Sequence, residues 1–357
     1  MTSIWDPIEI GAIKLEHRLA MAPMTRSRAD EHGVLGALNA EYYAQRASMG
    51  LVMTEGTQPS EDGQGYILTP GIHTDAQIAG WREVADAVHD GGGHLVIQLM
   101  HTGRVAHPEN TPHGRQPVAP SSVAAAGKMF TVDGMQPMPE PRELTADEVR
   151  ATVEDFRAAA RAAISAGADG VEVHGANGYL VHQFLSSNAN RRTDEYGGTI
   201  ADRIRFAVEV VAAVADEIGP ARTGIHQTPG NPFNDVREDD TRALYLALLE
   251  ALAPLDIAYV QVVHGGDEEL IRAMREAWPH GFVLNRADAD LETRLDDVES
   301  GLADVTSIGR MALANPDLVE RIRIGAPLNE PDPGTFYGGD EHGYTDYPAL
   351  ATLGATS

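Results

Sequence analysis

Eight short apolar runs, separated by longer amphipathic segments, constrain the fold of this chain more than any other feature. Runs of three to six residues rich in Val, Ile and Leu are typical of strands buried on both faces of a parallel sheet. The runs are Leu19–Ala22, Leu51–Glu55, Leu95–Leu99, Gly170–His174, Thr223–His226, Ala258–Val263, Phe282–Leu284 and Asp304–Ile308. Eight strands that alternate with helices predict an α/β fold, a single (β/α)8 TIM barrel over residues 1–357.

Helical patterns lie between most of these runs. Asp75–Asp90 carries an apolar stripe and ends at three glycines, and Thr145–Ala166 begins with the capping box Thr145-x-x-Glu148. Further helices are predicted at Asp202–Ile218, Asp239–Ala253, Glu268–Trp278, Leu291–Ser300 and Asp317–Ile324. The alternative is a doubly wound sheet. The barrel is favoured because PMTRSRA, the segment after the first run, holds no G-x-G-x-x-G fingerprint.

Two segments fall outside the strand and helix pattern. Residues 102–144 are Pro-rich and too long for an ordinary connection, so we interpret them as a loop excursion over the barrel mouth after the third strand. Phe336–Gly339 and Gly343–Pro348 are rich in Tyr and Gly. This C-terminal segment either folds back as a wall of a pocket near the barrel mouth or packs on the barrel exterior.

Composition excludes several functional classes. The chain has 53 acidic against 27 basic residues, a net charge of −26, which disfavours nucleic acid and anionic membranes as partners. It has no cysteine, so disulfides and thiolate metal sites are ruled out. The sequence has no signal-peptide pattern, no membrane span and no metal-binding motif, and we expect a cytoplasmic protein without a catalytic metal.

Polar residues follow the ends of many predicted strands. In a barrel these ends meet at one face, where active sites of this fold lie. The residues are Thr25, Arg26, Gly56, Thr57, Gln98, His101, Arg104, His174, Asn177, Tyr179, His226, His264, Asn285, Arg286, Gly309 and Arg310. Their recurrence at one end of the barrel predicts a functional site there.

Three groups of residues have specific interpretations, each with a structural alternative. His174 and Asn177 can polarise one acceptor oxygen while Tyr179 delivers a proton, unless the turn is only a loop of satisfied polar groups. Gly309 and Arg310 suit a phosphate monoester, unless Arg310 merely caps a helix at the surface. For Asn190–Gly198 we favour a structural ion-pair network.

Five motifs, in this order along the chain, resemble those of the Old Yellow Enzyme family. They are Ala22–Arg26 (APMTR), Glu41–Ala47 (EYYAQRA), Gln98–Arg104 (QLMHTGR), the block at 174–198, and Phe336–Gly339 (FYGG). Each motif alone is weak, but the ordered set is specific and covers nearly the whole chain. The resemblance implies a barrel that holds FMN non-covalently and reduces activated C=C bonds with hydride from NAD(P)H.

The resemblance also implies roles for individual residues. Tyr179 would protonate the α-carbon of the alkene, and His174 with Asn177 would hold its carbonyl or nitro oxygen. Tyr66, Met100 and Tyr337 would line the substrate pocket. The implied cofactor-binding residues are Pro23, Thr25, Gly56, Gln98, His226, Asn285, Arg286, Gly309 and Arg310.

Three positions depart from the family pattern. His226 stands where the family usually has an Arg against the flavin ring, and Asn285-Arg286 stands where a Gly usually contacts the phosphate. Arg286 could take the phosphate instead. Met100 replaces a common Trp, which should widen the pocket. Either FMN is bound with an altered potential, or an 8-hydroxy-deazaflavin serves as cofactor or donor.

The function expected from the sequence is therefore a flavin-dependent ene-reductase. Its partners would be activated alkenes and phenolic ligands, and the chain would be a monomer or a homodimer. Two alternatives of other classes are a non-catalytic flavin-binding barrel and a metal-dependent barrel hydrolase. The combination of His174, Asn177 and Tyr179 argues against the first, and the missing metal motifs argue against the second.

Overall fold

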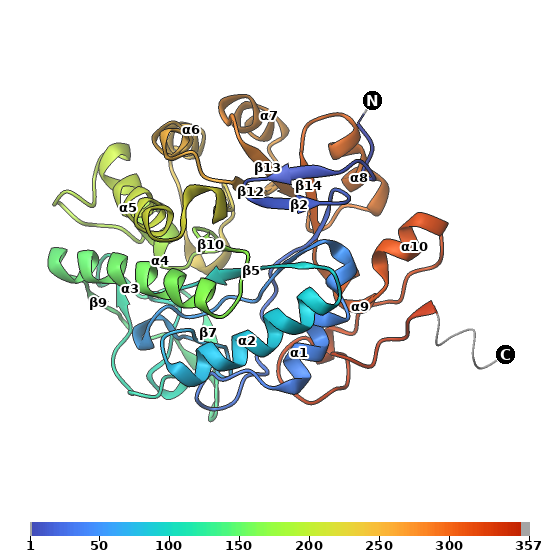
Figure 1. The fold of residues 1–357 in the computed structure, drawn as a ribbon. Coiled ribbons are helices and arrows are strands. Elements are labelled where there is room, and N and C mark those ends of the chain that lie inside the picture. Colours follow the sequence, from blue (N-terminus) through green and yellow to red (C-terminus); the bar gives the residue numbers. More distant parts are fainter. Residues whose placement is uncertain (1, 351–357) are drawn as a thin grey trace.

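The computed structural model describes residues 2–350 and shows a closed barrel of parallel strands surrounded by helices (Figure 1). The barrel strands are β3 (Leu19–Met21), β4 (Leu51–Met53), β5 (His94–Leu99), β10 (Gly170–His174), β11 (Thr223–Gln227), β12 (Tyr259–Val263), β13 (Gly281–Asn285) and β14 (Val305–Ile308). They pair in chain order, and β14 pairs with β3 to close the ring. Each strand matches a predicted run to within two residues, so the barrel is confirmed and the doubly wound sheet is wrong.

The outer layer consists of helices that follow the strands. The predicted helices are present as α2 (Asp75–Asp90), α3 (Ala146–Ser165), α5 (Ile200–Ile218), α6 (Thr241–Leu252), α7 (Glu268–Ala277), α8 (Leu291–Glu299) and α10 (Leu318–Ile324). Thr145 and Glu148 form the predicted capping box of α3. Three shorter helices were not predicted: α1 (Ala37–Ala44), α4 (Leu180–Leu185) and α9 (Arg310–Ala314).

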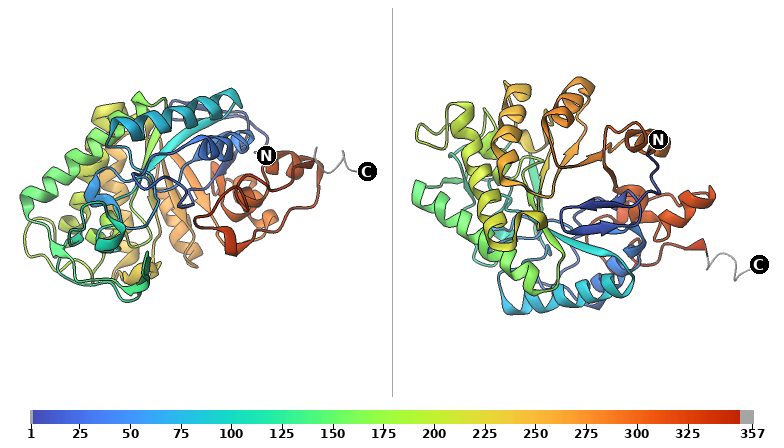
Figure 2. Two further views of the ribbon diagram at one scale, coloured as in Figure 1. Left: turned by 90° about the horizontal axis from the view of Figure 1, so that it is seen from below. Right: turned by 45° about the horizontal axis from the view of Figure 1, so that its top comes forward.

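The barrel interior is apolar at one end and polar at the other. Because side chains alternate along a strand, every second residue points inward. Near the amino ends of the strands these residues are apolar: Ala20, Leu51, Met53, Val96, Val283 and Val305. An N-terminal hairpin of β1 (Ile8–Ile10) and β2 (Ile13–Leu15) packs against them and covers this end (Figure 2, right). Space for polar side chains therefore remains at the carboxyl ends of the strands.

The excursion at 102–144 is more regular than the expected loop. It contains an antiparallel hairpin of β7 (Lys128–Thr131) and β8 (Gly134–Pro137), and β6 (Val118–Ala119) pairs in parallel with β9 (Arg142–Glu143). Phe130, Val132 and Met135 of the hairpin are mostly exposed. The excursion therefore contains short strands as well as loop, and its predicted position over the barrel mouth is confirmed, since Lys128, Met129 and Phe130 line the cavity described below.

The C-terminal segment returns to the start of the barrel. Arg26, in the loop after β3, donates hydrogen bonds to the carbonyl oxygens of Phe336, Thr335 and Gly343, and Gly338 N–H donates to the Arg26 carbonyl. The Arg46 guanidinium is fully buried and stacks on the Tyr42 ring, 3.9 Å from its centroid. Phe336 and Tyr337 line the cavity, so the segment forms a wall of the pocket.

Among residues 2–350, none of the helices combines the length and the apolar character needed to span a bilayer.

Replacing Arg46 should destabilise the fold strongly. Its guanidinium donates to the carbonyl oxygens of Tyr42, Ala312, Leu313 and Tyr344, which join α1, α9 and the C-terminal segment. We expect Arg46→Met to lower the free energy of unfolding by at least about 3 kcal/mol, because several buried carbonyls lose their donor. Urea denaturation measures this.

The matched control is Arg161→Met, whose guanidinium is 65% exposed and pairs only with Glu217 at the surface. This control should unfold at the same urea concentration as the unaltered protein. Equal stability of the Arg46 variant and the unaltered protein would contradict the view that the buried Arg46 stabilises the fold by joining these three segments.

Candidate active site

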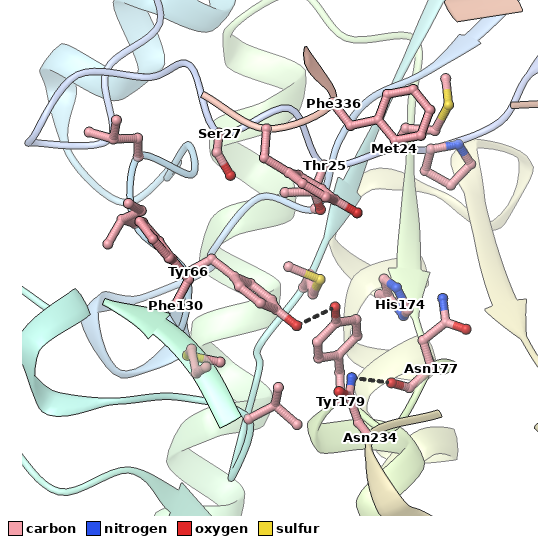
Figure 3. A pocket seen from close by; sticks show the side chains of 18 of the residues that line it. Met24, Thr25, Ser27, Tyr66, Phe130, His174, Asn177, Tyr179, Asn234 and Phe336 are labelled. Carbon is pink, nitrogen blue, oxygen red and sulfur yellow. Dashed lines mark hydrogen bonds between the residues drawn. The ribbon is translucent and has the colours of Figure 1, made fainter. Parts of the chain in front are cut away.

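A cavity of about 1090 Å³ lies at the carboxyl ends of the barrel strands (Figure 3). This is at the upper end of the roughly 300–1,000 Å³ that is usual for ligand pockets, so the cavity can hold a large cofactor. Most residues predicted for the site line it: Pro23, Thr25, Gly56, Tyr66, Gln98, Met100, His174, Asn177, Tyr179, His226, Arg310 and Tyr337. Asn285, Arg286 and Gly309 are not part of its lining.

The turn after β10 presents His174 and Asn177 to the cavity. Ala176 N–H donates to His174 Nδ1 over 3.2 Å, so the neutral ring carries its proton on Nε2. Burial and the nearby His226 and His182 hold the pKa of His174 well below its usual value. His174 is therefore a neutral hydrogen-bond donor at physiological pH.

Asn177 adopts a left-handed backbone conformation, with φ of +53°, which Asn tolerates better than most residues. Its N–H donates to Thr228 Oγ1 over 2.9 Å, and its carbonyl accepts from Asn234 Nδ2 over 2.8 Å. Figure 3 shows Asn177 and His174 on the same side of the cavity. The turn thus holds an amide and an imidazole at one place.

A buried network fixes this turn from behind. Gly178 N–H donates to His182 Nδ1 over 3.0 Å, and His182 Nε2 lies 2.6 Å from Glu238 Oε1. Tyr245 OH donates to the same oxygen over 2.7 Å, while Gly230 N–H donates to Glu238 Oε2. The side chains of His182 and Glu238 are 0% and 2% exposed. These contacts join α4, α6 and the loop after β11 beneath the turn.

Tyr179 meets Tyr66 inside the cavity. Their hydroxyl oxygens lie 3.0 Å apart, and the two rings are arranged edge to face (Figure 3). Burial raises the pKa of Tyr179 well above its ordinary value, and the neighbouring Tyr66 adds to this effect. Burial also raises the pKa of Tyr66. Tyr179 is therefore protonated at any pH where the protein would work, and Tyr66 is its hydrogen-bond partner.

Gln98 and His226 form the floor of the cavity. The Gln98 amide donates to Glu172 Oε1 over 2.8 Å and lies 3.1 Å from His226 Nδ1. Burial lowers the pKa of His226 to about 3. The His226 ring is thus uncharged, although it stands at a position where the family usually has an Arg. Beside it, a Cβ added to Gly56 would lie 2.5 Å from the Met100 thioether, so a larger residue here would displace the Met100 side chain.

The residues predicted for phosphate binding fall into two groups. Arg310 begins α9 directly after Gly309; it lines the cavity, is largely exposed and pairs with Asp288. Arg286 instead directs its guanidinium at Glu268 and Asp297, with both carboxylates accepting two hydrogen bonds. The structure gives the suggestion that Arg286 takes a phosphate no support, because these donors are committed to carboxylates and the side chain lies outside the cavity lining. Asn285 donates to Ser307 Oγ inside the barrel.

The remaining polar residues after the strands have structural roles. Arg192 pairs with Asp194 and donates to two buried carbonyls, as expected for the block at 190–198. Arg104 joins the excursion to the loop at 234–235. His264 pairs with Glu268. Among the described residues 2–350, no three His, Asp or Glu side chains are grouped so that they could hold a metal ion.

Several cavity residues were not predicted from the sequence. They include Met24, Ser27, Lys128, Met129, Phe130, Met138, Phe233 and Asn234. The nearness of Met24 and Ser27 to Thr25 in the sequence was a usable signal. The others in this list come from the excursion and the loop after β11, where no periodic pattern indicates which side chains point inward.

A family model described as NADH:flavin oxidoreductase / NADH oxidase family matches residues 3–329. A probable flavin mononucleotide-dependent alkene reductase of Leishmania infantum is 43% identical in an alignment of 353 residues, which covers 96% of this chain and 96% of its own. The 12-oxophytodienoate reductase 7 of Oryza sativa subsp. japonica is 40% identical and covers 97% of this chain and 94% of its own.

Solved structures show the same likeness. Morphinone reductase superposes with a TM-score of 0.94 at 44% identity, covering 98% of this chain and 97% of its own. It has also been solved in complex with tetrahydroNAD, at the same TM-score. The old yellow enzyme homologue of Zymomonas mobilis superposes with a TM-score of 0.95 at 38% identity, covering 98% and 100%.

Removing His182 should loosen the turn that carries Asn177 and Tyr179. The Glu238 carboxylate would stay buried without its ring partner, so we expect His182→Ala to lower the free energy of unfolding by about 3–5 kcal/mol. Denaturant titration provides the measurement. As a control, His264→Ala breaks a pair whose carboxylate side chain is 48% exposed, and it should cost less than about 1 kcal/mol. Similar losses in both variants would refute a special role for the buried network.

Proposed function

The chain belongs to the NADH:flavin oxidoreductase / NADH oxidase family, and we propose that it is an FMN-dependent ene-reductase. It would pass hydride from a reduced nicotinamide, by way of FMN, to the β-carbon of an α,β-unsaturated carbonyl or nitro compound. The observation that carries the proposal is one cavity in which a neutral His174 and Asn177 lie beside the protonated Tyr179.

The cavity residues fit FMN. Thr25, Gln98 and His226 offer hydrogen-bonding groups along the floor, as the polar edge of a flavin ring requires. Gly56 keeps the adjoining wall clear of a side chain. At the other end, the Arg310 guanidinium suits a phosphate. Pro23 and Met24 add apolar surface. Bound there, FMN would accept and deliver the hydride.

His174 and Asn177 would bind the substrate's oxygen. Their N–H groups would stabilise the negative charge that develops on this oxygen as hydride reaches the β-carbon. Donors placed in this way are worth roughly 3–4 kcal/mol in other enzymes. Because the neutral His174 ring carries its proton on Nε2, it can donate this hydrogen bond without placing a positive charge in the cavity. Phenols, whose oxygen resembles such a substrate oxygen, would bind at the same pair.

Tyr179 would protonate the α-carbon. Its hydroxyl is buried, keeps its proton at neutral pH and is hydrogen-bonded to Tyr66 OH, which would hold the hydroxyl in place and help to restore its proton. Nicotinamide and alkene would use the same part of the cavity in turn, since FMN fills much of its volume. Alternating use of one site gives ping-pong kinetics.

Absorption spectroscopy tests the cofactor and the donor together. The protein reconstituted with FMN should show an oxidised-flavin spectrum that bleaches under anaerobic NADPH or NADH and returns on addition of an enone. A flavin that binds but is bleached by neither nicotinamide would favour the non-catalytic barrel or a deazaflavin donor. Failure to bind FMN would overturn the proposal.

Tyr179→Phe should separate the two halves of the reaction. Reduction of the flavin by nicotinamide should keep its rate, whereas enone turnover should fall by roughly 10²–10⁴-fold, the usual contribution of a general acid. Stopped-flow absorbance measures each half separately. Tyr66→Phe, which keeps the Tyr179 hydroxyl, should lose less of the enone reaction. Undiminished turnover in Tyr179→Phe would mean that another group or solvent supplies the proton.

A further inference from the structure

A buried carboxyl group lies directly below the cavity floor. Glu172, in the middle of β10, is 0% exposed and points into the barrel. Its Oε1 accepts the hydrogen bond of Gln98, whereas Oε2 makes no well-formed hydrogen bond with the described residues and has the Tyr259 hydroxyl as its polar neighbour. Burial of a charged carboxylate without full compensation is costly, so this group has a strong reason to bind a proton.

The groups that face Glu172 bring no positive charge. The titratable groups are Tyr259 of β12, His226 of β11 and His174 of β10 itself. Tyr259 approaches over Gly224, where an added Cβ would lie 2.4 Å from its ring. From the other strands the interior receives only non-titrating side chains: Ala20, Leu51, Met53, Val96, Gln98, Val283, Asn285, Val305 and Ser307.

The two ionisable groups bonded to Gln98 respond to burial in opposite ways. Burial raises the pKa of Glu172 to about 7, against the opposing effects of the hydrogen bond from Gln98 and of the Tyr259 hydroxyl. Burial lowers the pKa of His226 to about 3. Near neutral pH, therefore, His226 stays uncharged, whereas Glu172 exchanges its proton with solvent.

One hydrogen-bonded residue connects Glu172 with the cavity. Gln98 contacts both Glu172 and His226, and both Gln98 and His226 line the cavity. Hydride transfer brings two electrons and one proton to bound FMN, which leaves one additional negative charge in the cavity. With a neutral His226 and no Lys or Arg among these neighbours, a proton is the available compensation.

We propose that Glu172 takes up one proton from solvent when FMN is reduced and releases it when FMN is reoxidised; this rests on the proposed function. The nicotinamide loses a hydride, FMN gains it, and the Glu172 carboxylate becomes a carboxylic acid. In the second half the hydride passes to the alkene, Tyr179 supplies the other proton of the product, and the Glu172 proton returns to solvent. Glu172 is thus a positioning residue that acts on the cofactor through Gln98.

The pH dependence of the flavin midpoint potential tests this. Below about pH 7 Glu172 already holds its proton in the oxidised protein, so reduction binds no further proton there. Above that pH, reduction should bind one more proton per two electrons, and the potential should fall by an additional ~30 mV per pH unit. Dye-mediated reductive titration of the FMN-loaded protein between about pH 6 and about pH 9 measures both slopes.

Three variants make the test specific. Glu172→Gln keeps the shape but cannot titrate, so the additional slope should vanish. His226→Arg places a fixed cation beside Glu172, which should then stay ionised, and the additional slope should again vanish. Asp169→Asn removes a carboxylate just before the amino end of β10, where it pairs with His89 and His94, and should leave the slope unchanged. Equal slopes in the unaltered protein and in Glu172→Gln would overturn the proposal.

A second measurement does not need the cofactor. Because folding raises the pKa of Glu172 from 4.5 to about 7, its stabilising contribution is full below about pH 4.5 and is lost as pH rises through 7. Relative to Glu172→Gln, the unfolding constant of the apoprotein should rise on the order of a hundredfold between about pH 5 and about pH 8.

A pH-independent ratio of these unfolding constants would overturn the proposal, since Glu172 would then hold no proton.

In the reductive titration, the dye supplies electrons to FMN without a nicotinamide. Failure of NAD(P)H to bleach the flavin would therefore count against the proposed function. The slopes of the midpoint potential against pH would still show whether Glu172 takes up a proton on reduction.

Discussion

The alternation of side chains along the eight strands of the closed barrel determines which side chains can contact one another inside it. Each strand offers its inward residues at fixed heights, and the parallel register places those of β5, β10 and β11 at one level. The lower level is filled by apolar side chains and by the N-terminal hairpin. Only the upper level has space for polar groups, so Gln98, Glu172 and His226 are brought together by topology rather than by proximity in sequence.

Features that depend on local pattern could be predicted from the sequence. The eight apolar runs became the barrel strands, and the capping box at Thr145 and Glu148 marks the true start of α3. Polar residues after the strands also had to meet, because carboxyl ends of parallel strands share one face. For that reason His174, Asn177 and Tyr179 could be assigned to one site before their positions were known.

Features that depend on side-chain direction could not be predicted. Arg286 follows β13 as the site residues follow their strands, yet Glu268 and Asp297 hold its guanidinium away from the cavity. Glu172 is visible as an acidic residue inside an apolar run, but its partner Gln98 lies 74 residues away. The hairpin of β7 and β8 and the short α1 have weak periodicity, and long-range packing rather than local preference orders them.

The bonds from Arg26 to the C-terminal segment have a consequence for the order in which the molecule matures. Arg26 and its acceptor Phe336 are 310 positions apart, so one wall of the cavity is synthesised long after the strand that it covers. A nascent chain on the ribosome would have most of its barrel strands but an incomplete pocket, with the Arg26 guanidinium lacking these carbonyl acceptors. Capture of the cofactor is then a late event, which keeps a redox-active group out of the folding intermediates.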